Sequence, residues 1–138
     1  MSATGTQLVH EQNKTIVRRW FEEVWNQSRL ETASELLAED GVIHDGEITY
    51  RGPKEFGVFY YQLRAAFSDF DIKPILDLAE GDLACLHWSA DFRHAASDKP
   101  VHVTGTSVVR IAKGQIVEAW QNWDAASLGE RLKRYGIS

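Results

Sequence analysis

Apolar residues along this chain recur first at helical spacing and later at every second position. Two stretches have spacings of three and four residues, which predicts helices with one wide apolar face. The first carries Ile16, Val17, Trp20, Phe21, Val24 and Trp25, and the other carries Phe56, Phe59, Tyr60, Leu63, Ala66 and Phe67. The latter helix begins at Gly52-Pro53, because proline suits the first helical position. A short helix over about 30–38 is predicted between the two. Residues 1–7 are expected to form a loose arm.

Alternating apolar and polar residues take over after residue 69 and predict four strands. They cover about 70–78, 83–94, 101–112 and 115–123. A short strand over 42–44 precedes them, and a last helix is expected over about 125–135, with Gly136 placed to end it. Pro74 demands an edge strand or a bulge, because it cannot donate to a ladder. Helices followed by an antiparallel meander predict one α+β domain over residues 1–138.

The two longest strands alternate in phase. Pairing them across the loop at 95–100 sets Trp88 opposite Ser107 and Ala90 opposite Gly105, and gathers the apolar residues on one face. That face comprises Ala84, Leu86, Trp88, Ala90, Phe92, Val103, Gly105, Ser107, Val109 and Ile111. Small residues at its centre leave room between the sheet and the helices, which predicts a cavity there.

The turn at Lys113-Gly114 decides which face the last strand presents to this cavity. A tight two-residue turn places Ile116, Glu118, Trp120, Asn122 and Asp124 on the cavity side. A longer loop with a bulge places Val117, Ala119, Gln121 and Trp123 there instead. The sequence leaves both alternatives open.

The opposite sheet face mixes polar and apolar side chains. It carries His87, Ser89, Asp91, Thr104, Thr106 and Arg110, with Cys85 and Val108 among them. This set is less charged than a free surface usually is, so we expect a homodimer formed through it.

Composition limits the classes of partner. The 138 residues carry a net charge of −5, which argues against nucleic acid and anionic membranes as partners. Cys85 is alone, there is no signal peptide, and no apolar run approaches the roughly 20 residues of a membrane span, so a cytoplasmic protein is expected. His87 and His94 point to opposite strand faces, and no metal site is expected.

Three runs of this sequence resemble the SnoaL-like polyketide cyclases of the nuclear transport factor 2-like superfamily. They are WFEEVWNQSRLETASELLAEDGVIHDG, AFSDFDIKPILDLAEGDLACLHW and GQIVEAWQNWDAASLGERL, and the resemblance extends over about 14–136. It implies a cone-shaped α+β fold, in which a curved antiparallel sheet wraps around a deep pocket. Relatives such as ketosteroid isomerase, limonene epoxide hydrolase and scytalone dehydratase do acid–base chemistry there, usually without metal or organic cofactor. Others only bind or dimerise, so the fold does not fix the function.

The resemblance also assigns roles to residues. The family's acid/base aspartate at the end of the last strand matches Asp124, and its HxP position matches His44, although this chain reads HDG there. Asn26 matches a polar position near the pocket. Asn122 stands where the epoxide hydrolases have an aspartate, and their Arg-x-Asp pair is absent, so their mechanism is not expected here.

Each candidate also has a structural interpretation. Asp124 is either the N-cap of the last helix or an acid/base whose pKa is raised by burial against Trp120 and Trp123. His44 is a proton carrier or a structural histidine, and Trp88 and Trp120 are pocket walls or plain core. Tyr60 points its hydroxyl into the cavity or away from it.

Two functions follow from these residues. The first is a small cofactor-free acid/base enzyme of the cyclase/isomerase type, acting on an apolar carbonyl-bearing molecule. In it Asp124 and His44 are catalytic, and Trp120, Asn122, Trp88, Tyr60 and Asn26 bind the substrate. The second is a non-catalytic domain that binds a small apolar ligand or dimerises. A cavity with Asp124 inside it favours the first, and a cavity lined only by apolar groups, or filled by Trp88 and Phe92, favours the second.

Overall fold

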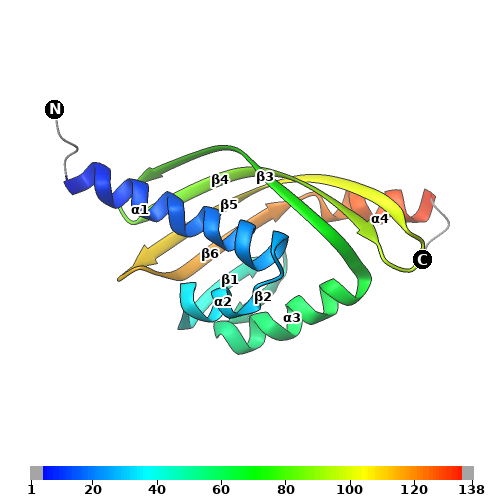
Figure 1. Ribbon diagram of the computed structural model, residues 1–138, viewed down its shortest axis with the longest axis horizontal. Coiled ribbons are helices and arrows are strands. Elements are labelled where there is room, and N and C mark those ends of the chain that lie inside the picture. Colours follow the sequence, from blue (N-terminus) through cyan, green and yellow to red (C-terminus); the bar gives the residue numbers. More distant parts are fainter. Residues whose placement is uncertain (1–4, 135–138) are drawn as a thin grey trace.

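A curved six-stranded sheet carries the helices on one face, as the computed structural model of the protein shows (Figure 1). Residues 5–134 are described, without the side chains of 125–127, 131 and 134. The helices are α1 (Gly5–Arg19), the π-helix η1 (Trp20–Asn26), α2 (Leu30–Leu36), α3 (Gly52–Ala66) and α4 (Ala125–Arg134). The strands are β1 (Leu37–Asp45), β2 (Ile48–Arg51), β3 (Phe67–Glu80), β4 (Leu83–His94), β5 (Lys99–Ala112) and β6 (Gln115–Trp123).

The predicted α+β architecture is confirmed, with additions. The strand order is β2-β1-β6-β5-β4-β3, and β1 runs parallel to β6 while the other neighbours are antiparallel. Neither the hairpin strand β2 nor this parallel pair was predicted. Pro74 does lie on the edge strand β3, beside a register shift. No helix within residues 5–134 is long and apolar enough to cross a membrane.

Several predicted boundaries are wrong. α1 already begins at Gly5, so the loose arm of residues 1–7 is too long, and residues 1–4 lie outside the described chain. Phe67 was assigned to a helix but begins β3, where its ring packs against Phe92 at 5.1 Å between centroids. The predicted end of the last helix, at Tyr135 and Gly136, lies outside the described residues.

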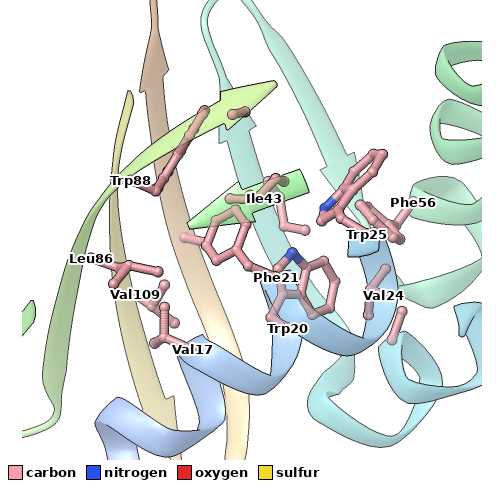
Figure 2. Packing of buried hydrophobic residues seen from close by; sticks show 14 of the residues in the cluster. Val17, Trp20, Phe21, Val24, Trp25, Ile43, Phe56, Leu86, Trp88 and Val109 are labelled. Atoms are coloured by element: carbon pink, nitrogen blue, oxygen red, sulfur yellow. The ribbon is translucent and has the colours of Figure 1, made fainter. Parts of the chain in front are cut away.

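The π-helix η1 continues α1 and aims its large side chains at the sheet. The N–H of Gln27 donates to the carbonyl of Glu22 at 2.9 Å, an i to i−5 bond that widens the turn. Two pairs of neighbouring residues are buried along this helix, namely Trp20 with Phe21 and Val24 with Trp25. Figure 2 shows Trp20, Phe21 and Trp25 reaching from this helix into the space between the sheet and α3.

Trp88 fills space that the sequence had left empty. The observed pairing sets Trp88 opposite Gly105 and Ala90 opposite Val103, two residues away from the predicted register. A shift of two keeps every side chain on its predicted face, so the inner face is as expected. A Cβ on Gly105 would lie 2.3 Å from Cζ2 of Trp88. The indole therefore lies directly over Gly105, and the room predicted there is occupied.

A bulge in β6 settles the orientation of the last strand. Lys113 and Gly114 form a tight turn with φ of 52° and 75°, and Ile111 pairs with Ile116. The next pair is Arg110 with Glu118, which leaves Val117 as an extra residue. The tight turn is thus present, but the bulge after it exchanges the inward and outward positions along the rest of the strand. The inward residues are Ala119, Gln121 and Trp123.

We predict that Gly105→Ala lowers the free energy of unfolding by about 1–3 kcal/mol, because the added methyl displaces the Trp88 ring from a packed position. Gly57→Ala in α3 is the matched control. No atom lies within 4 Å of its new Cβ, so it should stabilise the helix by about 0.5–1 kcal/mol. Urea unfolding of both variants checks this. Equal free energies of unfolding for the two variants would contradict the close packing of Trp88 on Gly105.

Candidate active site

An aromatic-lined cavity lies between the inner sheet face and the helices. Its empty volume is about 730 Å³, counting the open mouth. Aromatic rings from both sides make most of the wall: Trp20, Phe21, Trp25, Tyr50, Phe56, Phe59, Phe67, Phe70, Trp88, Phe92 and Trp123. Leu128 of α4 also borders it. Such a lining excludes water and strengthens any electrostatic interaction inside.

Asp45 is the one carboxylate among the described residues that line this cavity. It is the last residue of β1, and Gly46 follows in a left-handed conformation with φ of 63° that turns the chain into β2. Ile43 points inward and is 4% exposed, so Asp45, two residues later, lies on the same face. The strand therefore delivers a carboxylate to the lip of an apolar cavity.

The surroundings of Asp45 change its acidity. Removal from water raises the pKa of the Asp45 carboxyl above its ordinary value. The indole N–H of Trp123 donates to Asp45 Oδ1 at 2.9 Å, which lowers the pKa and offsets part of this rise. Burial is the larger effect, so the carboxylate is a stronger base than an exposed aspartate.

Tyr50 brings a hydroxyl to the same cavity, within reach of the charge of Asp45. It stands opposite Ile43 in β2, and its ring lies 4.5 Å from that of Phe59 between centroids. Burial raises the pKa of Tyr50 to about 12, and the negative charge of Asp45 adds to the rise. The phenol therefore stays protonated at neutral pH and can donate a hydrogen bond.

Gln121 is the remaining polar side chain of the cavity floor. The parallel pairing of β1 and β6 sets Gln121 beside Asp45. The hydroxyl of Ser107 donates to Gln121 Oε1, and the indole N–H of Trp88 donates to Ser107 Oγ at 3.0 Å. Trp88, Ser107 and Gln121 thus form a hydrogen-bonded row across β4, β5 and β6.

The structure separates the predicted site residues. Trp88 lines the cavity, but Trp120 and Asn122 do not, because the bulge at Val117 turns them to the outer face. The prediction that these two face the cavity is wrong. Tyr60 is buried without lining the cavity, and its hydroxyl donates to the carbonyl of Val24 at 2.8 Å.

Asn26 holds the cavity wall from behind. Its Nδ2 donates to the carbonyl of Ile72 at 2.9 Å, and its Oδ1 accepts from the Ile72 N–H at 2.7 Å. Ile72 lines the cavity, whereas Asn26 does not. Asn26 therefore fixes β3 to the end of η1 and makes no contact with the cavity itself.

His44 and Asp124 both lie outside the cavity. His44 Nε2 is 2.7 Å from Glu118 Oε2, and its ring stacks on Trp120 with 5.8 Å between centroids. Asp124 is exposed between β6 and α4, where its carbonyl accepts from the N–H of Leu128 at 3.1 Å. Their catalytic roles stay predictions, and neither residue is among those that line the cavity.

Sequence reasoning missed Asp45, Tyr50 and Gln121. The signal for Asp45 was available, since an inward Ile43 places the residue two positions later on the same face. The signal for Gln121 was the bulged alternative for the last strand. Together these side chains combine a basic carboxylate with hydrogen-bond donors, which suits proton transfer to or from carbon.

Known structures share this fold. A proposed SnoaL-like polyketide cyclase from Jannaschia sp. CCS1 superposes with a TM-score of 0.82, at 16% identity over 94% of each chain. IdmH, a proposed polyketide cyclase from Streptomyces antibioticus, gives 0.77 at 24% identity, over 88% of this chain and 99% of that one. An LEH-like epoxide hydrolase from M. tuberculosis gives 0.75 at 15% identity, over 91% of this chain and 92% of that one.

At these identities the likenesses establish the nuclear transport factor 2-like fold and not a reaction. No curated protein matches the chain. The SnoaL-like domain matches residues 17–119, from α1 to the inward Ala119 of β6. This stretch includes Asp45, Tyr50 and Trp88, so three of the residues that shape the cavity lie inside the matched region. The chain belongs to the SnoaL-like domain family.

Proposed function

We propose that this protein is a small acid/base enzyme of the cyclase/isomerase type, and that Asp45 is its base. The observation that carries the proposal is a carboxylate with a raised pKa on the inner face of an aromatic cavity. A general base is most effective when its pKa lies near the working pH, and burial moves an aspartate in that direction. Asp45 takes the role that the sequence assigned to Asp124, because Asp124 does not line the cavity.

The proposed reaction begins with an apolar molecule whose carbonyl lies beside a C–H bond. Asp45 takes the proton, and the electron pair of that bond moves onto the carbonyl oxygen to give an enolate. The protonated Tyr50 hydroxyl donates to the oxygen as charge develops there. The enolate then recovers the proton from Asp45 at another carbon. Alternatively its carbon attacks a second carbonyl carbon of the same molecule and closes a ring, while the π pair of that carbonyl moves onto its oxygen, which takes the proton back from Asp45.

Trp123 orients the base throughout. Its indole N–H holds Asp45 Oδ1 at 2.9 Å, so the other carboxylate oxygen is the one available to a substrate. The aromatic walls exclude competing water, which keeps the base desolvated and the enolate away from bulk proton donors.

We predict that Asp45→Asn lowers enzyme-catalysed deuterium exchange at the α-carbons of 2-tetralone by about 10²-fold or more, since general-base catalysis typically contributes that much. Asp124→Asn is the matched control and should retain exchange, because its carboxylate is exposed beyond β6. Proton NMR in D₂O, corrected for the enzyme-free rate, measures both. Loss of exchange in Asp124→Asn alone would move the chemistry to that residue.

The pH dependence should follow Asp45. Exchange requires the carboxylate, so its rate should rise with pH through the raised pKa of this group, with a midpoint above that of an ordinary aspartate. A raised folded-state pKa stabilises the fold at low pH, and this contribution is lost as pH rises through the folded pKa. Asp45→Asn should therefore have a higher free energy of unfolding than wild type at pH 7. Urea unfolding should show that this gap between variant and wild type narrows at acidic pH. A gap that widens on acidification would contradict this assignment.

A second function is a non-catalytic binder of small apolar ligands. It is favoured by the near absence of polar surface in the cavity, where Asp45, Tyr50 and Gln121 face a mainly aromatic wall. Ligand binding without exchange in wild type would select this function over the first.

We also propose a homodimer through the outer sheet face, in a reducing compartment such as the cytoplasm, which suits the single free Cys85. Val108 and Trp120 pair across β5 and β6 on this face and are half-buried in the single chain. Light scattering at micromolar concentration should give a dimer mass, and Val108→Lys should give a monomer. Val58→Lys, at an exposed apolar position on α3, is the control and should remain dimeric. A monomeric wild type would contradict the proposal.

A further inference from the structure

We propose that Gln121 is the residue that recognises a ligand oxygen in the cavity, and that Trp88 and Ser107 position it for this role. The inference rests on the proposed function only in taking the cavity as the ligand site. Under this inference the hydrogen-bonded row, and not Asp45, selects ligands that carry a hydrogen-bond acceptor.

The direction of each hydrogen bond in the row follows from donor chemistry and from the amide oxygen of Gln121 facing Ser107. An indole N–H can only donate, so Ser107 Oγ must accept from Trp88 Nε1 at 3.0 Å. The single proton of the Ser107 hydroxyl is then free to donate, and it meets Gln121 Oε1. Ser107 is fully buried at 0% exposure, so water does not compete for this bond.

This row fixes which end of the Gln121 amide faces the cavity. With Oε1 held by Ser107, the amide nitrogen is left to donate, and within residues 5–134 no hydrogen bond from it is found. Gln121 lines the cavity, and its amide nitrogen is not among the fully buried polar atoms without a partner, so this nitrogen is not sealed off from solvent or a ligand. A donor of this kind can bind an acceptor oxygen of a ligand that displaces water from it.

The donor stands beside the base. Asp45 and Gln121 are register partners in the parallel pair of β1 and β6, and both side chains face inward. The two groups therefore line the cavity side by side. A carbonyl oxygen held by Gln121 would bring the neighbouring C–H to the Asp45 side, whereas a hydrocarbon of the same shape would leave the amide unpaired.

Two probes of equal shape test the inference: acetophenone, which carries a carbonyl oxygen, and α-methylstyrene, which carries a CH₂ group in its place. Titration calorimetry gives the affinity of each for the intact protein. In Gln121→Leu the affinity for acetophenone should fall by roughly 2- to 12-fold relative to wild type, the range expected for one hydrogen bond. The affinity for α-methylstyrene should not fall. Gln115→Leu is the matched control, because Gln115 lies on the same strand but outside the cavity and donates to the carbonyl of Glu35.

Variants of Ser107 test the positioning. Ser107→Ala should reduce the preference for acetophenone by releasing the amide, and Ser107→Thr, which keeps the hydroxyl, should restore it. Three results would each overturn the inference. In Gln121→Leu the affinities for both probes could fall equally, or the preference for acetophenone could stay unchanged. Wild type could also fail to bind acetophenone. Asp45→Asn separates the two proposals, since it should abolish exchange and leave the preference for acetophenone intact.

Discussion

One extra residue in β6 decides which chemical groups the cavity contains. Without the bulge at Val117, the strand would turn Trp120 and Asn122 inward and leave Gln121 and Trp123 outside. Asp45 would then lack its indole partner, and the row from Trp88 would end at Ser107. The register of β5 and β6 therefore underlies the acidity of the base and the orientation of the donor alike.

The fold was predictable because its signals are redundant. Two long strands alternate in phase, and either one alone identifies the inner face, so an error of two residues in their register moved no side chain to the wrong side. The helices were equally clear from their apolar spacing. The parallel contact of β1 with β6 was not predictable in this way, because it joins segments far apart in the chain and leaves no local pattern.

The site was harder to predict because its position depends on single residues. The sequence left two alternatives open at Lys113-Gly114, and the site residues followed the tight turn. That turn is present, but one bulged residue reverses the facing of the residues after it. Asp45 was not predicted as a site residue, because an aspartate before glycine is typical of a turn, whereas the neighbouring His44 suggested a proton carrier. The small residues near Trp88 suggested empty space, and the structure shows that Gly105 is small because the indole rests on it.

The bond between Trp123 and Asp45 joins residues 78 positions apart. Contacts of such long range close large loops and are expected to form late in folding. A chain that has emerged from the ribosome only as far as β5 thus carries Asp45 on an unfinished edge, with neither Gln121 nor Trp123 beside it. The chemical environment of the carboxylate is created by the docking of the last strand, which also joins β1 to β5 and completes the sheet.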